Sequence, residues 1–504
     1  MFTKTIITSI LDSIQKFSDR NAFCIDDIFY TYKQLAENIS KIRIAIKNIP
    51  FENKKVCLVV NDDIETYASI IALWLEGKAY VPIHPHWPKD RCLDIVKQVN
   101  ADLVLNSSEH VCEYMKSTPS EGVNILYTGR LSYEKDYLDC VSLTMDDELA
   151  YILFTSGSTG KPKGVMITRG NVSSFMDAFG KTGIEITETD RCLQCFDLTF
   201  DVSIQGYLVP LTKGACCYTV PHGQVKYIYV SGLIEDQKLT FGAMAPSMLR
   251  YLKPYFGELD ATSFKNCILT AEACPLSLVE DWYKCAVNTE VYDFYGPTEA
   301  TIYCTYYKLS KTYTNKTLNG IVSIGKPLAG ISAIIVDENG NEVTQGEKGE
   351  LCVAGGQITM GYWDNDDMNE RAFFEKEFNG KRLRFYHTGD LCFQDVDGDI
   401  MYSGRIDQQA KIQGFRVELG EIEFHAREYL GGINVVCVAH ENKQHLTEIV
   451  MFVESEEFDV IELFEYMRDK MPSYMIPARV IFEPSFPLNS NDKIDRNRLK
   501  KLLL

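Results

Sequence analysis

Short apolar runs that alternate with helical patterns constrain the fold of this chain more than any other feature. Val56–Val60 is typical of a buried strand and Tyr67–Leu75 of a helix, and two more strands are expected at Ala79–Pro82 and Asp102–Asn106. Strands that alternate with helices favour parallel sheets in an α/β fold. Because 504 residues exceed the size of one compact core, we expect at least two domains.

Two later changes of pattern divide the chain. Residues Ile321–Tyr402 hold short strands between Gly-rich turns, which predicts a small β-rich subdomain. After Asp407 the pattern predicts a compact α+β domain of about one hundred residues. Its expected elements are a helix at Glu418–Tyr429, strands at Val435–Ala439 and Glu448–Val453, and a helix at Val460–Met471. We therefore expect a large N-terminal domain over residues 1–406 and a small mobile C-terminal domain over residues 407–504.

The charge balance limits the possible partners. The chain has 51 basic and 70 acidic residues and a formal net charge of −19, which disfavours binding to nucleic acid or to an anionic membrane. No window approaches 18 uncharged apolar residues, so we expect no membrane span. Lys4, Asp12 and Lys16 interrupt the apolar start, unlike a secretory signal, and we expect a cytoplasmic protein.

The sixteen cysteines are mostly scattered singly. The one CxxC spacing, Cys192 to Cys195, lacks the second pair or the spaced histidines of a zinc site. A redox pair is an alternative, but two buried thiols beside a strand are the simpler interpretation. We expect free thiols in a reducing compartment.

One loop carries the groups that a polyphosphate requires. The segment from Thr155 to Gly164, TSGSTGKPKG, follows the apolar strand Leu149–Thr155. Its glycines allow backbone N–H groups to point inward, and its hydroxyl and ammonium groups add donors. No Gly-Lys-Ser/Thr ends the run, so it is not the P-loop pattern. A flexible linker is the alternative, but linkers rarely follow a buried strand and carry two lysines.

Tyr151–Gly164 resembles the signature of the acyl-adenylate-forming superfamily, which contains acyl-CoA synthetases, luciferases and the adenylation domains of peptide synthetases. The resemblance extends from about Ala79 to the C-terminus. It is closest to amino-acid adenylation domains, especially the stand-alone D-alanine–carrier protein ligases. The further matching segments, in the family's order, are Phe200–Asp201, Tyr295–Glu299, Gly349–Leu351, Tyr386–Asp390, Gly404–Asp407, Lys411–Glu418 and Asp492–Asp495.

This resemblance implies a fold and a reaction. The implied large domain has two doubly wound αβ sheets and a small β-barrel subdomain, and the implied small domain is α+β. The implied reaction joins a carboxylate to the α-phosphate of ATP with Mg²⁺, releases pyrophosphate and passes the acyl group to a thiol. Because two anions must approach, catalysis needs fixed positive charge and donors more than acid–base groups.

The resemblance also implies residue roles. Lys493 would bridge the carboxylate and the α-phosphate, Tyr295 would pack on adenine, Glu299 would carry Mg²⁺, and Asp390 would hold both ribose hydroxyls. A solvated lysine, a Gly-Pro turn and a capping Asp are the structural alternatives. The implied ATP-binding set is Thr155, Ser156, Gly157, Ser158, Thr159, Gly160, Lys161, Lys163, Tyr295, Gly296, Thr298, Asp390, Tyr402, Arg405 and Lys493. The implied catalytic set is Lys493, Thr155, Glu299 and Lys411.

Asp201 stands where family members that activate amino acids carry an Asp that pairs with the substrate ammonium. A buried carboxylate without its ammonium is costly, so such a site rejects simple carboxylic acids. The implied wall positions are Val202, Gln205, Ala243, Ile268, Thr270, Phe294, Ile302 and Tyr303. Bulky Phe294 and Tyr303 favour a small amino acid such as alanine, serine, glycine or threonine. D-alanine ligases usually carry Cys where this chain has Thr270, so the enantiomer stays open.

Asp407 matches the hinge of the family, and Lys411 and Gly414 match the segment that serves the thiol step. We find no Gly-Gly-x-Ser-like phosphopantetheine site near the end of the chain. We therefore expect the thiol on a separate phosphopantetheinylated carrier protein or on coenzyme A. An acyl- or aryl-CoA ligase, an amide-forming ligase and a non-catalytic nucleotide-binding homologue are the alternatives.

Two positions depart from the family pattern. The motif usually read as Tyr-Val-Pro-Ile-Asp-Pro has His84 in place of the Asp. The residue before Lys493 is Asp492, where the family usually has Gly.

Overall fold

The computed structural model describes residues 1–117, 123–139, 141–142, 144–157, 161–407, 409–488 and 494–503. The chain divides into two compact units. The first unit comprises Met1–Pro85, Val96–Leu153 and Gly164–Ile406, and the second comprises His86–Ile95, Phe154–Lys163 and Asp407–Leu504. Two short segments from earlier in the chain, His86–Ile95 and Phe154–Lys163, thus belong to the same unit as the C-terminal residues.

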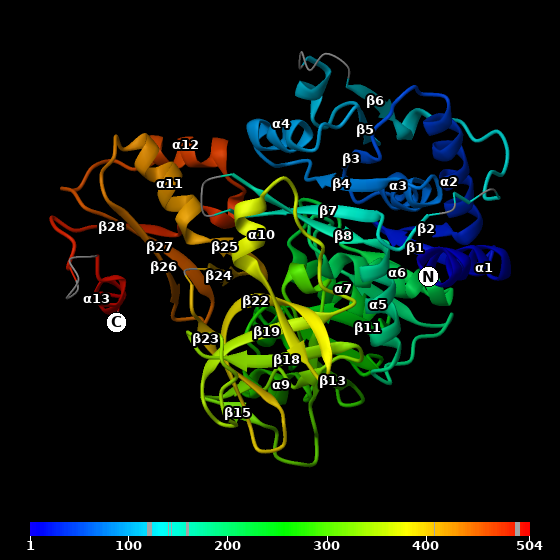
Figure 1. Ribbon diagram of the computed structural model, residues 1–504. Helices are drawn as coiled ribbons and strands as arrows, with labels where there is room; N and C mark the ends of the chain where they lie inside the picture. Colours follow the sequence, from blue (N-terminus) through cyan, green and yellow to red (C-terminus); the bar gives the residue numbers. More distant parts are fainter. Residues whose placement is uncertain are drawn as a thin grey trace. The chain divides into compact units, whose positions relative to one another are not determined.

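A nine-stranded sheet forms much of the first unit, in the order β17-β14-β13-β12-β11-β9-β10-β1-β2. Figure 1 labels four of its strands, β1, β2, β11 and β13. The parallel strands are β1 (Asn21–Ile25), β9 (Arg191–Gln194), β10 (Cys216–Thr219), β11 (Phe241–Met244), β12 (Asn266–Thr270) and β13 (Glu290–Tyr295). The antiparallel strands are β2 (Ile28–Thr31), β14 (Thr305–Lys308) and β17 (Lys326–Pro327). The chain passes from β9 to β10 on one side and then to β11 on the other. The carboxyl ends of β9 and β11 therefore form a topological switch point, where α/β sheets bind ligands.

A seven-stranded sheet has the order β20-β8-β7-β4-β3-β5-β6. Its strands are β3 (Lys55–Val59), β4 (Ala79–Ile83), β5 (Leu103–Asn106), β6 (Asn124–Tyr127), β7 (Leu149–Thr155), β8 (Lys163–Thr168) and β20 (Gly361–Tyr362). The pairs β3–β4, β3–β5, β4–β7 and β5–β6 are parallel. Strand β20 is antiparallel to β8. The strands expected from the apolar runs near residues 56, 79, 102 and 149 are confirmed.

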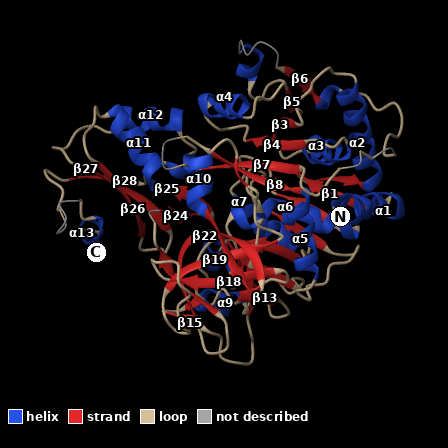
Figure 2. Cartoon of the chain, in the orientation of Figure 1, coloured by secondary structure: helices blue, strands red, loops and turns tan. Residues whose placement is uncertain are grey.

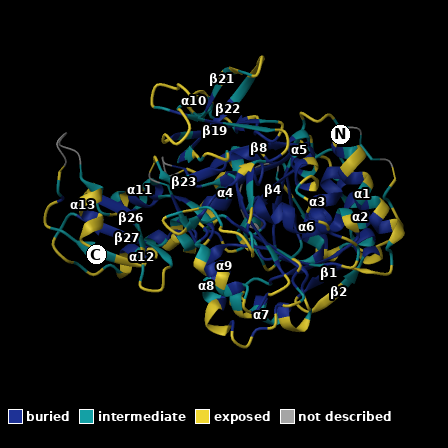
Figure 3. Ribbon diagram, turned by 90° about the horizontal axis from the view of Figure 1, so that it is seen from below, coloured by how far each residue is buried: buried dark blue, intermediate teal, exposed yellow. Residues whose placement is uncertain are grey.

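Helices cover both sheets (Figure 2). Helices α3 and α6 are buried along most of their length (Figure 3). One hydrophobic cluster joins β3 and β4 to β11, β12 and β13 through these two helices, so the two sheets share a core. The described α-helices before residue 407 are α1 (Thr8–Lys16), α2 (Tyr32–Lys47), α3 (Ile64–Leu75), α4 (Lys89–Gln98), α5 (Arg169–Gly180), α6 (Val202–Lys213), α7 (Lys226–Asp236), α8 (Pro246–Leu252), α9 (Leu276–Trp282) and α10 (Asp366–Ala372).

The β-rich region predicted after residue 321 is a five-stranded antiparallel sheet. Its order is β18-β19-β22-β21, and β23 pairs with the long strand β22. The bounds are β18 (Ile331–Val336), β19 (Gly349–Gly355), β21 (Phe373–Phe378), β22 (Lys381–Gln394) and β23 (Ile400–Arg405). A short hairpin, β15 (Thr317–Leu318) and β16 (Ile321–Val322), precedes it.

The C-terminal part of the second unit is α+β, as the periodicities predict. Hairpin β24-β25 leads into α11, and a three-stranded sheet β26-β27-β28 packs with α11 and α12 around one hydrophobic cluster. The bounds are β24 (Gln409–Ile412), β25 (Phe415–Glu418), α11 (Leu419–Tyr429), β26 (Val435–Glu441), β27 (Thr447–Val453), α12 (Ile461–Lys470), β28 (Arg479–Phe482) and α13 (Arg496–Lys501).

Fifteen cysteines lie in the described ranges, and all are free and buried. The prediction of free thiols, including the pair Cys192 and Cys195, is therefore confirmed for them. Among the described helices, none has both the length and the apolar character that crossing a membrane requires.

Candidate functional site

The predicted amino-acid pocket lies at the switch point of the nine-stranded sheet. Asp201 is the residue before α6 in the segment that follows β9, and Gln205 lies on the first turns of α6. Across the sheet, Ala243 pairs in register with Ile268, and Thr270 pairs with Phe294. The predicted wall residues are all buried: Val202, Gln205, Ala243, Ile268, Thr270, Phe294, Ile302 and Tyr303. Sequentially distant positions thus meet because the carboxyl ends of parallel strands share one edge.

Asp201 is the buried charge of this pocket, with 6% of the residue exposed. Burial raises the pKa of its carboxyl to about 7; the Thr298 hydroxyl lowers the pKa, and the nearby Glu299 charge raises it. Oδ2 of Asp201 has no hydrogen-bond partner among the described residues, and neither amide atom of the fully buried Gln205 has one. Buried polar atoms without partners are rare and costly. A carboxylate and an amide in this state are suited to a polar ligand with an ammonium group.

Aromatic rings limit the volume beside Asp201. The ring centroids of Phe294 and Tyr303 are 4.9 Å apart. Phe175 and Phe179 of α5 extend the cluster, at 6.0 Å from Tyr303 and 6.1 Å from Phe294 respectively. Such contacts fix the wall in one arrangement.

The backbone that follows Glu299 is strained. Thr301 and Ile302 have φ values of 53° and 76°, which is unusual for β-branched residues. The buried Gln357 amide donates hydrogen bonds to the carbonyls of Ala300, Thr301 and Tyr303 at 3.2, 3.3 and 2.6 Å. Sequence reasoning missed Gln357, because it lies in the loop after β19 and no short motif marks it. It holds the turn that positions two of the predicted wall residues.

Glu299, the predicted Mg²⁺ ligand, is fully buried at the carboxyl end of β13. Its Oε1 accepts a hydrogen bond of 2.7 Å from the Tyr362 hydroxyl. Tyr362 is a second residue that the sequence did not mark, and it orients the carboxylate. One oriented carboxylate, with phosphate oxygens and waters, is a donor set that Mg²⁺ accepts, so Glu299 is suited to this metal.

Three predicted nucleotide-binding residues meet at the end of β13. The Tyr295 hydroxyl donates to Asp390 Oδ2 at 2.5 Å, and Arg405 donates to Asp390 Oδ1 at 2.9 Å. Asp390 and Arg405 are paired in register on β22 and β23, and Tyr402 lies on β23 as well. Next to Tyr295, a Cβ on Gly296 would lie 2.5 Å from the Ile302 carbonyl oxygen, so the close chain approach requires glycine.

The described residues of the phosphate loop up to Lys163 lie in the second unit. The Gly157 N–H donates to Glu421 Oε2 at 2.9 Å, and Glu421 also pairs with Arg91 at 2.8 Å. Ser156 exchanges hydrogen bonds with backbone groups of residues 416 and 418. Lys163 pairs with Glu418 at 3.1 Å, whereas Lys161 is exposed. The loop N–H and Lys163 thus already engage carboxylates, which bind the same donors as phosphate does.

Several predicted residues lie outside the described residues. They are Ser158, Thr159, Gly160 and Lys493. Thr155 ends β7, and its buried hydroxyl has no hydrogen-bond partner among the described residues.

The segment predicted for the thiol step forms the hairpin β24-β25. Lys411 lies on β24 opposite Arg416. Gln413 and Gly414 form the two-residue turn, with φ values of 50° and 85°, which is typical of a tight hairpin. Asp407, the predicted hinge, accepts a hydrogen bond of 3.0 Å from the Gln409 N–H.

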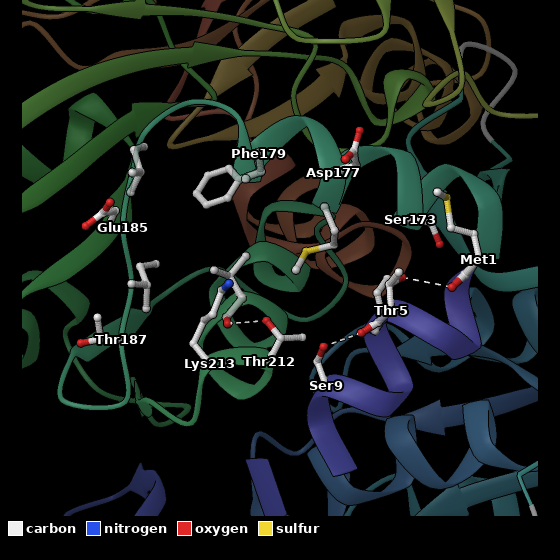
Figure 4. A pocket seen from close by; sticks show the side chains of 16 residues that line it. Met1, Thr5, Ser9, Ser173, Asp177, Phe179, Glu185, Thr187, Thr212 and Lys213 are labelled. Carbon is white, nitrogen blue, oxygen red and sulfur yellow. Dashed lines mark hydrogen bonds between the residues drawn. The ribbon is translucent and has the colours of Figure 1, made fainter. Parts of the chain in front are cut away.

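A separate pocket of about 490 Å³ lies between α1, α5 and α6 (Figure 4). Met1, Ser9, Asp177, Phe179 and Lys213 are among its lining residues. Phe179 lines it and also contacts the wall residue Phe294, but none of the predicted ATP- or substrate-binding residues lines it, so this pocket is not the predicted site.

The sequence of the chain is similar to segments of two longer synthases and to most of a third. It is 29% identical over 97% of its length to tyrocidine synthase 2 of Brevibacillus parabrevis and covers 13% of that protein. It is 29% identical over 98% of its length to gramicidin S synthase 1 of Brevibacillus brevis, of which it covers 44%. The chain therefore spans less than half the length of each of these two relatives. It also matches zwittermicin A synthase ZmaJ of Bacillus cereus, with 30% identity over 94% of this chain and 90% of that protein.

The fold is similar to that of solved adenylation domains. The Vibrio cholerae adenylation domain AlmE, in complex with glycyl-adenosine-5'-phosphate, superposes with a TM-score of 0.87 at 23% identity over 99% of this chain and 97% of that chain. The sequence profile described as AMP-binding enzyme matches residues 11–363. Because this match covers more than half of the 504 residues, the chain belongs to the AMP-binding enzyme family.

Proposed function

We propose that the chain activates a small amino acid with MgATP and transfers it to the phosphopantetheine thiol of a separate carrier protein. The substrate carboxylate attacks the α-phosphorus, forming the aminoacyl-AMP and releasing pyrophosphate. The thiol then attacks the acyl carbon, forming a thioester and releasing AMP. The single observation that carries the proposal is the buried Asp201 carboxylate, whose Oδ2 has no hydrogen-bond partner among the described residues.

Asp201 would accept the substrate ammonium group and so fix the position of the carboxylate. Once an ammonium group pairs with it, the carboxylate is no longer an uncompensated buried charge, whereas a simple carboxylic acid leaves it uncompensated. The Phe294–Tyr303 wall favours a short side chain, and Gln205 offers an amide for a hydroxyl. The solved AlmE domain with glycyl-adenosine-5'-phosphate supports a small amino acid by similarity.

The nucleotide would bind at the carboxyl end of β13. Asp390 would exchange its bonds to Tyr295 and Arg405 for the ribose hydroxyls, since a carboxylate accepts two hydrogen bonds at once. Arg405 would then be available to an anion. Glu299 would hold Mg²⁺, which neutralises phosphate charge when bound. Lys493, by similarity to the family, would bridge the substrate carboxylate and the α-phosphate.

Amino-acid-dependent exchange of labelled pyrophosphate into ATP tests the first step. The panel contains glycine, D- and L-amino acids, fatty acids and aryl acids. We expect exchange with one or a few small amino acids, with a loss of about 10²-fold or more in Lys493→Ala, because removal of a preorganised transition-state donor costs about this much. Lys501→Ala, an exposed lysine of α13, is the matched control and should keep full exchange. Exchange with only fatty or aryl acids would contradict the role of Asp201.

The second step has its own test. Lys411→Ala should keep pyrophosphate exchange but slow the loading of a phosphopantetheinylated carrier protein. Equal loading of coenzyme A would identify that thiol as the acceptor instead. Exchange that is lost together with loading would show that Lys411 acts in adenylation and not in the thiol step.

A further inference from the structure

Two histidines and an aspartate meet at a place that the proposed reaction does not use. His84 follows β4 of the seven-stranded sheet, while Asp197 and His222 follow β9 and β10 of the nine-stranded sheet. His84 is also the residue that replaces the family's usual Asp. One ligand atom from each of the three side chains lies within 4.8 Å of the other two.

We propose that His84, Asp197 and His222 form a binding site for a divalent transition-metal ion, with zinc as the ion it fits best. Imidazole nitrogen and carboxylate oxygen are zinc ligands, at about 2.0–2.2 Å from the metal. Two atoms bound to one zinc ion are therefore at most about 4.4 Å apart, which small side-chain rotations reach from the observed spacing. Three protein ligands with a water in the fourth position are a common zinc arrangement.

The contacts of Asp197 hold its carboxylate in a ligand orientation. Oδ1 accepts hydrogen bonds from the Thr199 N–H at 2.8 Å and from the Thr199 hydroxyl at 2.6 Å. Oδ2 lies 2.8 Å from His84 Nε2, so a proton joins these two atoms in the metal-free state. Zinc would replace this proton and bind through a lone pair of His84 Nε2 and a lone pair of Asp197 Oδ2. Outer-sphere hydrogen bonds of the Thr199 type orient metal ligands in proteins.

His222 is oriented in the same way. Its Nε2 lies 3.1 Å from the Val60 carbonyl oxygen, at the end of β3. If Nε2 donates to this carbonyl, Nδ1 carries the lone pair, and metal-binding histidines usually have such a backbone partner. The His84 and His222 rings meet edge to face, with centroids 5.1 Å apart.

Two other charged groups influence the cluster. Asp62 is half-buried nearby. Loss of hydration raises the pKa of its carboxyl and the Asp197 charge raises it further, whereas the Lys226 charge favours the charged forms of both carboxyls. The Lys226 ammonium donates to the Cys195 carbonyl at 3.3 Å. Lys226 thus already supplies positive charge, and a zinc ion would bind against its repulsion. Removal of this lysine charge should therefore strengthen zinc binding.

Such an ion would join the carboxyl ends of strands from both large sheets. The His222–Val60 and His84–Asp197 contacts already link these ends, and the metal would strengthen this link and stabilise the folded first unit without taking part in adenylation. Metal binding at this site is independent of the proposed function, because it is measured without substrate or ATP.

Competition titration with a chromophoric chelator tests the site on the full chain, purified under reducing conditions and stripped of metal. We expect one zinc equivalent and a zinc-dependent rise in Tm. His84→Gln and His222→Gln should each weaken binding at least about tenfold, since even an outer-sphere partner is worth about 10- to 100-fold. The exposed His110→Gln is the matched control and should bind as tightly as the wild type. Lys226→Met should bind more tightly.

Cobalt distinguishes this site from thiols and from the Glu350–Cys352–His387 cluster, which also brings three ligand types together. A nitrogen and oxygen site gives Co²⁺ d–d absorption without thiolate charge transfer. The proposal is overturned if zinc does not saturate at one equivalent or if thiolate charge transfer is observed. It is equally overturned if His387→Gln weakens binding while His84→Gln and His222→Gln leave it unchanged.

Discussion

At the scale of single residues, Asp201 combines burial with a carboxyl pKa raised to about 7. Its ammonium-binding form is the carboxylate, so substrate binding should weaken as pH falls below that value. We expect the KM of the activated amino acid in pyrophosphate exchange to rise about tenfold per pH unit below about pH 7. Asp201→Asn should raise KM at pH 8 and remove this dependence. A wild-type KM that is flat from pH 5 to 8 would contradict the assignment.

The same pKa has a consequence for stability. Because the folded state raises the pKa above its unfolded value, folding takes up a proton between about pH 4 and 7, and this contribution to stability is lost as pH rises through that range. The free energy of unfolding should fall by up to about 1.4 kcal/mol per pH unit there. Denaturant unfolding of wild type and Asp201→Asn at pH 5 and pH 8 measures the difference. The variant should lose less stability toward pH 8.

Gln357 is a positioning residue, and its substitution should lower both stability and activity although its amide N–H groups bond only to backbone carbonyls. Gln357→Leu would leave three carbonyls of the strained 300–303 turn without their donor. We expect a loss of about 2–3 kcal/mol in stability and roughly a tenfold loss in kcat/KM for the amino acid. The exposed Gln345→Leu is the matched control. Equal effects of both substitutions on KM would show that the turn is held by other contacts.

At the scale of elements, the described helices α2 and α5 both begin with capping boxes, but they differ in the further hydrogen bonds that the capping side chains make. Thr31 caps α2 through Gln34. In α5, Asn171 bonds to the Thr168 N–H and also donates to the carbonyls of Gly356 and Ile358 at 2.9 and 3.0 Å. The α5 cap therefore joins a helix to the loop that carries Gln357.

These caps predict unequal losses. Thr31→Ala should cost about 1 kcal/mol, as for a typical N-cap. Asn171→Ala should cost about 2–3 kcal/mol, because it leaves two carbonyls and a helix N-terminus without their partner. Thermal unfolding of both variants gives the comparison. A smaller loss for Asn171→Ala would mean that water replaces the lost bonds.

At the scale of the whole molecule, the thiols report how completely the two sheets are packed. All fifteen described cysteines are buried, and burial raises the pKa of thiols such as Cys195, to about 11. Thiolates are the reactive form, so a native chain should react slowly with a thiol reagent. We expect at most about one fast thiol in the native chain and all sixteen after denaturation. Several fast native thiols would indicate local opening of the strands that carry them.

Much of the fold could be predicted from local patterns. The strand Leu149–Thr155 and the helix expected at Val460–Met471 depend on short apolar runs and on helical spacing, which the local sequence carries. The sheet order could not be predicted in this way. The switch between β9 and β11 depends on which strands pair, and pairing is a long-range property of the whole core.

The sequence by itself determined which chemistry the chain offers: hydroxyl- and lysine-rich loop residues, a candidate Asp201 and an acidic, thiol-rich composition. Only the tertiary structure decided which of these groups are buried and which of them meet. In the tertiary structure Asp201 Oδ2 has no partner among the described residues. Gln357 and Tyr362 hydrogen-bond to Tyr303 and Glu299 of the site. His84 lies beside Asp197 and His222. The physical reason is that residue type fixes a group's bonding capacity, whereas its solvation and its partners depend on strands far apart in sequence that fold to one edge.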